Sequence, residues 1–152
     1  MPEKETMRKA RADAAEGKSS STQAGEFVRE EIHHVREGKH GARSAKQAIA
    51  IGLSKARRAG IKLRQPKRST TSANTREKAR KDSDRGGHPS KPSAKRSRAT
   101  LSALKRERRT SVSSEALAEQ AHLSASQRTR KERSTVGKKA AKTRSGRSQS
   151  RH

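Results

Sequence analysis

Apolar residues recur at helical spacing in two stretches of this chain, residues 22–37 and 44–60, and only weakly elsewhere. Residues three and four apart are neighbours on a helix surface, so each stripe of apolar residues marks one buried face. The first stripe is Ala24, Phe27, Val28, Ile32 and Val35. The second is Ala45, Ala48, Ile49, Gly52, Leu53, Ala56 and Ala59. Both stretches are therefore predicted to be amphipathic helices.

The ends of the second stretch carry residues that start and stop helices. Ser44 can accept hydrogen bonds from the first turn, and Gln47 completes a capping box. Gly60 stands where a left-handed residue closes a helix. The apolar face is mostly small residues, which lets a partner helix approach closely. The turn GKHGAR joins the two helices, so we predict a two-helix hairpin over about residues 22–60. Its predicted core is Phe27, Val28, Ile32, Val35, Ile49, Leu53 and Ala56.

The remainder of the chain has a weaker pattern. We predict a fraying helix over residues 3–16, which completes a helical unit over residues 1–63. A linker rich in Pro, Gly and Ser is predicted over residues 64–93, with at most a short helix near 75–82. Marginal basic helices are predicted over residues 94–134, and a disordered basic tail over residues 135–152. Leu, Ile, Val and Phe number only 15 of 152 residues while the net charge is +25, a balance typical of disorder. The predicted fold class is mostly α with extensive disorder.

The hairpin is short of large apolar residues, which indicates that it needs a partner to be stable. Ile51 points about 100° away from the apolar arc, so one contact between two helices cannot bury it. We therefore expect a homodimer through residues 22–63, with Ile51 in the second contact.

The stretch KQAIAIGLSKARRAG, residues 46–60, resembles the signature of a bacterial family of short basic proteins of unknown function. The preceding STQAGEFVREEIHHVREGKHGARS, residues 21–44, is similar to the same family, and the resemblance covers roughly residues 1–63. It implies a bacterial origin and a shared helical unit, and it supplies no activity. The tail TVGKKAAKTRSGRSQSRH resembles the tails of linker-histone-like proteins in composition.

Charge is distributed unevenly and points to the partner. Residues 1–63 hold 14 Lys/Arg against 8 Asp/Glu, a net of +6, whereas residues 64–152 hold 26 against 7, a net of +19. Such an excess favours phosphate contacts with a nucleic acid. The chain has no Trp, no Tyr and one Phe, so base stacking on such rings cannot be the mode, which argues against RRM-like or OB-type single-strand readers. Composition does not separate DNA from RNA; duplex DNA is the partner we favour, with RNA as the alternative.

The predicted function is a non-enzymatic, nucleoid-associated protein that binds DNA with little sequence preference. The predicted nucleic-acid-binding residues are Arg57, Arg58, Lys91, Lys95, Arg96, Arg98, Lys105, Arg106, Arg108, Arg109, Arg128, Arg130, Lys131, Arg133, Lys138, Lys139, Lys142, Arg144 and Arg147. Two alternatives stay open: an RNA- or ribosome-associated protein, and a protein-interaction module that the basic tail localises. The second alternative draws on the acidic residues Glu26, Glu30, Glu31 and Glu37.

Other chemistry has little support in the sequence. His33, His34 and His40 are the nearest approach to a metal site, but no Cys exists and no carboxylate is obviously placed to complete the ligand set, so we predict neither metal nor cofactor. No nucleophile elbow or phosphate-binding loop is present, so we predict no enzyme. No apolar run reaches the length of a signal-peptide core, so we expect a cytoplasmic, nucleoid protein with no membrane partner.

Overall fold

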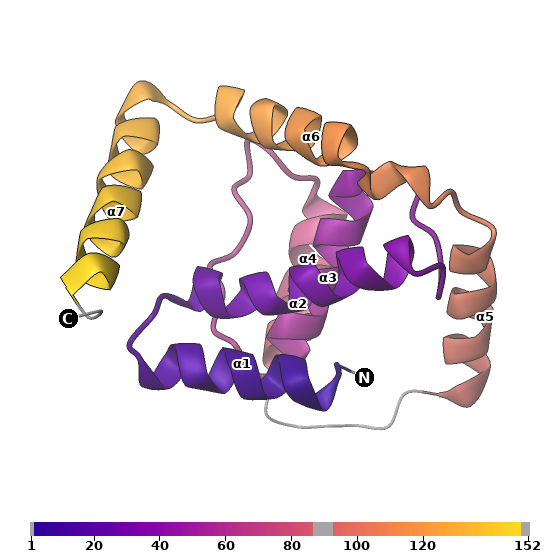
Figure 1. Ribbon diagram of the computed structural model, residues 1–152. Helices are drawn as coiled ribbons and strands as arrows, with labels where there is room; N and C mark the ends of the chain where they lie inside the picture. The colour runs from indigo at the N-terminus through magenta and orange to yellow at the C-terminus, as the bar shows by residue number, and fades with distance from the viewer. Residues whose placement is uncertain (1, 87–92, 150–152) are drawn as a thin grey trace. The chain divides into compact units, whose positions relative to one another are not determined.

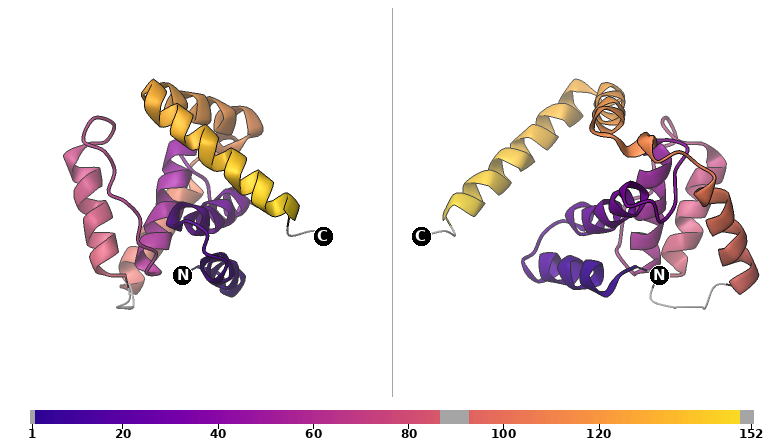
Figure 2. Two further views of the ribbon diagram at one scale, coloured as in Figure 1. Left: turned by 90° about the vertical axis from the view of Figure 1, so that its left-hand side faces the viewer. Right: turned by 45° about the vertical axis from the view of Figure 1, so that its right-hand side comes forward.

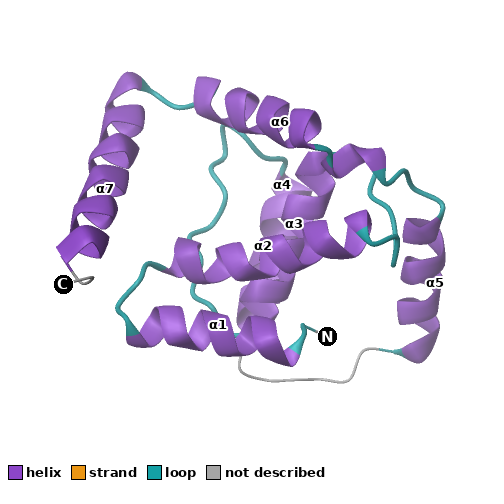
Figure 3. Ribbon diagram, in the orientation of Figure 1, coloured by secondary structure: helices purple, strands orange, loops and turns teal. Residues whose placement is uncertain are grey.

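The computed structural model describes residues 2–86 and 93–149, which form helices and no strand (Figures 1 and 3). The elements are α1 Lys4–Ala15, α2 Ser20–Arg36, α3 Ala45–Arg58, α4 Ala73–Asp84, α5 Ala94–Lys105, the 3₁₀ helix η1 Thr110–Val112, α6 Ser114–Ser126 and α7 Arg130–Gln149. They belong to two compact units that divide between Leu117 and Ala118, within α6. No helix among the described residues is both long and apolar enough to cross a membrane.

Helix starts follow the capping residues in the sequence. The hydroxyl of Ser44 accepts a hydrogen bond from the backbone N–H of Gln47 at 3.2 Å, as predicted. The Gln47 side chain in turn accepts from the N–H of Arg43 at 2.6 Å, so the capping residues hold the chain that enters α3. Gly60 has a φ of 93° just after α3, which is the left-handed conformation expected of a helix stop.

The core of the first unit lies around α2 and α3. These two helices pack together, α1 packs on α2, α4 packs on α3, and η1 contacts both central helices (Figures 1 and 2). One cluster joins buried Ala10, Ala24, Phe27 and Ala56, with Leu53, Met7 and Ile61 packed against it. The second joins Val35, Ala42, Ala48 and Val112, with Ile32 packed against it. Phe27, Val35 and Ala56 are thus fully buried core residues as predicted, while Val28, Ile32, Ile49 and Leu53 are half-buried.

The prediction of a separate two-helix hairpin is wrong, because later residues complete its core. The loop after α2 is tied to the end of α5: the N–H of Gly41 donates to the carbonyl of Leu104 at 2.8 Å, and the N–H of Ala42 donates to that of Arg108 at 3.1 Å. Val112 is only 1% exposed within the second cluster. Residues later in the same chain therefore supply the apolar contacts that the hairpin lacks.

The prediction of extensive disorder is also wrong for the described residues. α4 occupies much of the predicted linker, and α7 runs through the predicted tail as far as Gln149. Composition misled the prediction because it counts core-forming residues and does not register helix caps, which act locally. At the start of α7 the Thr129 hydroxyl accepts from the N–H of Glu132 at 3.3 Å, and the Glu132 carboxylate accepts from the N–H of Thr129 at 3.0 Å. This reciprocal pair is a capping box.

Candidate functional site

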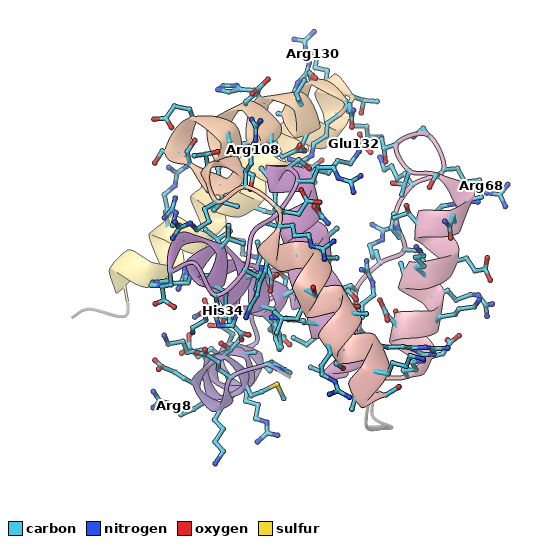
Figure 4. All side chains as sticks on the ribbon, turned by 90° about the vertical axis from the view of Figure 1, so that its right-hand side faces the viewer. Arg8, His34, Arg68, Arg108, Arg130 and Glu132 are labelled. Carbon is cyan, nitrogen blue, oxygen red and sulfur yellow. The ribbon has the colours of Figure 1, made fainter. Side chains whose placement is uncertain are left out.

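The predicted nucleic-acid-binding residues fall mainly on α5, on the segment that follows it, and on α7. The exposed members in the first unit are Arg58, Lys95, Arg96, Arg98, Lys105, Arg106, Arg108 and Arg109. Those in the second unit are Arg128, Arg130, Lys131, Arg133, Lys138, Lys139, Lys142 and Arg144. Figure 4 shows Arg130 projecting away from its helix. Lys91 and the side chain of Arg147 lie outside the described residues.

α5 carries cations without acids. Its sequence AKRSRATLSALK has four Lys/Arg and no Asp or Glu, and no residue of the helix is buried. Among the described ion pairs, none involves Lys95, Arg96, Arg98 or Lys105. α7 is similar in composition, because RKERSTVGKKAAKTRSGRSQ contains a single acid, Glu132. α5 thus has a net charge of +4 and α7, with eight Lys/Arg and one acid, a net charge of +7, so the two helices hold +11 of the chain's net +25.

Several cations of α1, α2 and α4, and Lys18 between α1 and α2, differ from those of α5 because they contact carboxylates. Lys9 pairs with Glu5 at 2.8 Å and Lys18 with Asp13 at 2.7 Å. Equivalent pairs join Arg29 to Glu26 at 3.2 Å and Arg80 to Asp84 at 3.4 Å. The cation of each pair is exposed, so the pair contributes little stability, but it lowers the local net charge.

Arg57 does not belong with the exposed cations, although the sequence placed it there. Its side chain is buried, with the residue 7% exposed, and its guanidinium donates to the carbonyl of Arg64 at 3.5 Å. Burial lowers the pKa of Arg57, and the nearby Asp82 carboxylate opposes that shift. Arg58 lies 3.8 Å from the same aspartate. Both arginines therefore lie near the α3–α4 packing, and Arg57 is not presented to a nucleic acid.

Two neighbouring acids of α2 are buried and face α3. Glu31 is fully buried and Glu30 is 6% exposed. The Lys55 ammonium lies 2.7 Å from Glu31 Oε2 and 3.3 Å from Glu30 Oε1. Burial of a carboxylate is costly unless a cation lies beside it, so Lys55 stabilises this arrangement. Glu26 on α2 pairs with Arg29, and Glu37 just after the helix pairs with Lys39. All four acids of this region therefore have a basic partner.

Two of the three histidines singled out in the sequence, His34 and His40, lie close to Glu31. Glu31, His34 and His40 each place one potential ligand atom within 4.8 Å of the others. His33, by contrast, is exposed and contacts Glu37 at 3.0 Å. The sequence showed no carboxylate obviously placed to complete a ligand set, and the structure brings Glu31 to His34 and His40. The spacing of three residues between Glu31 and His34 on one helix was the signal that could have identified this carboxylate.

A cavity of about 230 Å³ opens beside this cluster. His34 lines it together with Glu3, Glu30 and Lys39. Glu3 Oε1 lies 2.8 Å from His34 Nε2, and this hydrogen bond, with a second from Lys39, lowers the pKa of Glu3. Figure 4 labels His34. The contact between Glu3 and His34 thus joins the N-terminal end of α1 to α2 beside the Glu31, His34 and His40 cluster.

Comparison with known proteins identifies a family without assigned chemistry. Residues 15–68, about a third of the chain, match the model of a Family of unknown function (DUF6496). No curated protein and no solved structure matches the chain. The matched region contains α2 and α3 with the loop between them, so similarity to an uncharacterised family is confirmed for that part of the chain.

Proposed function

We propose that this protein binds duplex DNA through its phosphates, with little sequence preference, using α5, residues 106–109 and α7. The observation that supports the proposal is the separation of paired from unpaired cations. Several cations in and beside α1, α2 and α4 contact carboxylates, whereas those of α5 have no such partner among the described residues. A cation that is already paired releases few counterions from DNA, so we expect α5, together with the strongly cationic α7, to supply most of the affinity.

Phosphate contacts fit this chain better than base reading does. The single aromatic residue, Phe27, is fully buried, so no aromatic side chain is available to stack on a base. If about eight phosphates are neutralised, log K falls with log salt with a slope of about −7 on duplex DNA. No base specificity follows from such contacts.

The charge on α7 provides a second reason to expect a polyanion. Lys138 and Lys142 stand four residues apart, and like charges at this spacing destabilise a helix by a few tenths of a kcal/mol. Phosphates beside α7 would reverse that repulsion. Binding is therefore expected to increase the helical content of α7.

The test compares three variants that each lose four positive charges. One replaces Lys95, Arg96, Arg98 and Lys105 of α5 with Gln, and the second replaces Arg130, Lys131, Arg133 and Lys138 of α7. The control replaces Lys9, Lys18, Arg29 and Arg80, all of which contact carboxylates. Affinity for a duplex is measured by fluorescence anisotropy of labelled DNA over a range of salt concentrations.

We expect the α5 and α7 variants to bind more weakly. The slope of log K against log salt should become shallower by up to about 3.6, at roughly 0.9 per lost phosphate contact. The control is expected to keep both its affinity and its slope. Equal losses in all three variants would show that only net charge matters, and unchanged binding by both test variants would refute the assignment.

A duplex RNA of the same length distinguishes the main alternative. The cations of α5 and α7 could equally follow an A-form backbone, and preferential binding to RNA would replace DNA in the proposal. The alternative of a protein-interaction module is less favoured, because Glu26, Glu30, Glu31 and Glu37 all contact basic side chains.

The homodimer through residues 22–63 stays a prediction. It rested on the hairpin's shortage of core and on the position of Ile51, and the first of these reasons no longer holds. α1, α4 and η1 now supply the packing that a second copy was expected to provide. Ile51 is half-buried in the single chain. Sedimentation of the full-length protein without DNA, for wild type and Ile51→Lys, tests it. A wild type that is monomeric at high concentration would exclude the dimer.

A further inference from the structure

We propose that Glu31, His34 and His40 bind one divalent transition-metal ion, with Zn²⁺ as the reference ion. Glu31 and His34 are neighbours on one face of α2, and His40 returns to them from the loop that follows the helix. Their ligand atoms lie within 4.8 Å of one another. This site is separate from the cationic helices and does not depend on the proposed DNA binding.

The His40 ring is oriented for a cation. Its Nδ1 lies 3.0 Å from the carbonyl oxygen of Gly41, which can only accept, so Nδ1 carries the proton. Nε2 therefore faces Glu31 Oε1, 3.3 Å away. Either a proton on Nε2 or a metal ion between the two atoms can satisfy this contact, and we propose the metal ion. Two ligands of one tetrahedral zinc ion are separated by about 3.4 Å, given bonds of roughly 2.0–2.1 Å, so the observed spacing suits the ion.

Glu31 is a buried carboxylate that lacks hydrogen bonds. Its side chain is 1% exposed, and neither Oε1 nor Oε2 has a hydrogen-bond partner. Lys55 neutralises it as an ion pair at Oε2, 2.7 Å away. Oε1 faces His40 instead and is available for a metal. Ligating carboxylates and histidines usually have such partners on their outer side, as Lys55 and the Gly41 carbonyl are here.

His34 connects the site to solvent. Glu3 holds its Nε2 at 2.8 Å, a carboxylate–histidine contact of the kind that orients metal ligands. His34 also lines the cavity of about 230 Å³ beside α1, through which an ion can enter. The group spans somewhat more than the roughly 3.4 Å between ligands of bound zinc, so the rings must move inward on binding.

The ligand types select the metal. Imidazole favours Zn²⁺, Cu²⁺ and Ni²⁺, whereas Mg²⁺ prefers oxygen ligands and serves as a negative control. Two histidines and one glutamate leave the fourth tetrahedral position open to water or to another small ligand. His33, adjacent in sequence, exposed and paired with Glu37, provides a matched control residue.

The test is isothermal titration of the full-length, tag-free, metal-stripped protein with Zn²⁺. We expect one ion per chain, and roughly a tenfold or greater loss of affinity in His34→Ala and in His40→Gln. His33→Ala is expected to bind like wild type, and Mg²⁺ is expected to bind no variant. Circular dichroism checks that each variant remains folded.

A measurement on the wild type keeps the test decisive if a variant unfolds. In NMR spectra of the histidine rings, saturating Zn²⁺ is expected to shift the His34 and His40 signals and to leave His33 unchanged. Absence of saturable Zn²⁺ binding would overturn the site. A loss in His33→Ala equal to that in His34→Ala, or a shift confined to His33, would mean an adventitious ion only and would overturn it as well.

Discussion

Gly52 is the point where α3 comes closest to α2, and an added methyl group there tests the packing of the whole first unit. A Cβ atom at Gly52 would lie 2.7 Å from the Cα of Val28 and 3.0 Å from the carbonyl oxygen of Phe27. Carbon atoms in contact are normally about 3.5–4.0 Å apart. Because the nearest atom belongs to the backbone, no side-chain rotation relieves the clash, and the helices must separate.

The magnitude follows from comparison with Gly25, which lies within α2 but has nothing within 4 Å of a built Cβ. Both glycines are in helix interiors, where Ala is better than Gly by roughly 1 kcal/mol. Gly25→Ala is therefore expected to stabilise the protein by about that amount. Gly52→Ala gains the same propensity but adds the cost of overpacking, about 1–3 kcal/mol. The difference between the two variants isolates the steric cost, which we place near 3 kcal/mol because backbone is involved.

Urea unfolding is the assay, and Phe27 is its probe. The chain has no Trp or Tyr, and Phe27 is its only aromatic residue and fully buried, so its ring NMR signals report on the core alone. Adding Val28→Ala to Gly52→Ala should not restore stability, since the Val28 Cα remains. A Gly52→Ala variant as stable as Gly25→Ala would refute the close approach of α2 and α3.

Three further changes test other parts of the structure. Lys55→Met leaves Glu31 buried without its ammonium and should lower the free energy of unfolding by about 3 kcal/mol in the presence of a chelator; an unchanged urea midpoint would contradict the buried ion pair. Val112→Asp puts a charge where the side chain is 1% exposed, and should speed hydrogen exchange at the Gly41 amide while the Phe27 signals persist; protection equal to wild type would count against that contact. Gly137→Ala in α7 meets no neighbouring atom and should favour the helix by up to about 1 kcal/mol, seen as greater ellipticity; no gain would argue against a helix there.

Helix faces and caps could be predicted from the sequence because both depend on residues close together in the chain. The predicted roles of Ser44 and Gly60 are confirmed at the two ends of α3. Burial of Phe27 and Val35 followed from their spacing alone. The small-residue face of α3 also correctly indicated the close approach that Gly52 makes to α2.

Contacts between distant segments could not be predicted, because no local pattern encodes them. Val112 stands in a polar, serine-rich segment, and nothing near it signals that it joins a core more than 60 residues earlier in the chain. Glu31 belongs to a run of charged residues that resembles a solvated face. Its burial is stabilised by the Lys55 ammonium, which reaches it from α3. Counting large apolar residues therefore underestimated the ordered part of the chain.

The distribution of acids gives the two ends of the chain different responses to salt. Eight of the 15 Asp/Glu lie in residues 1–63 beside 14 Lys/Arg, and some are buried or fastened in ion pairs. Salt screens buried pairs weakly, so the α2–α3 core should depend little on ionic strength. α7 has one acid for its many cations, so salt reduces its internal repulsion and favours the helix. The same salt weakens phosphate contacts. Folding of α7 and its proposed binding to DNA therefore respond to salt in opposite directions, and DNA can replace salt as the source of the neutralising charge.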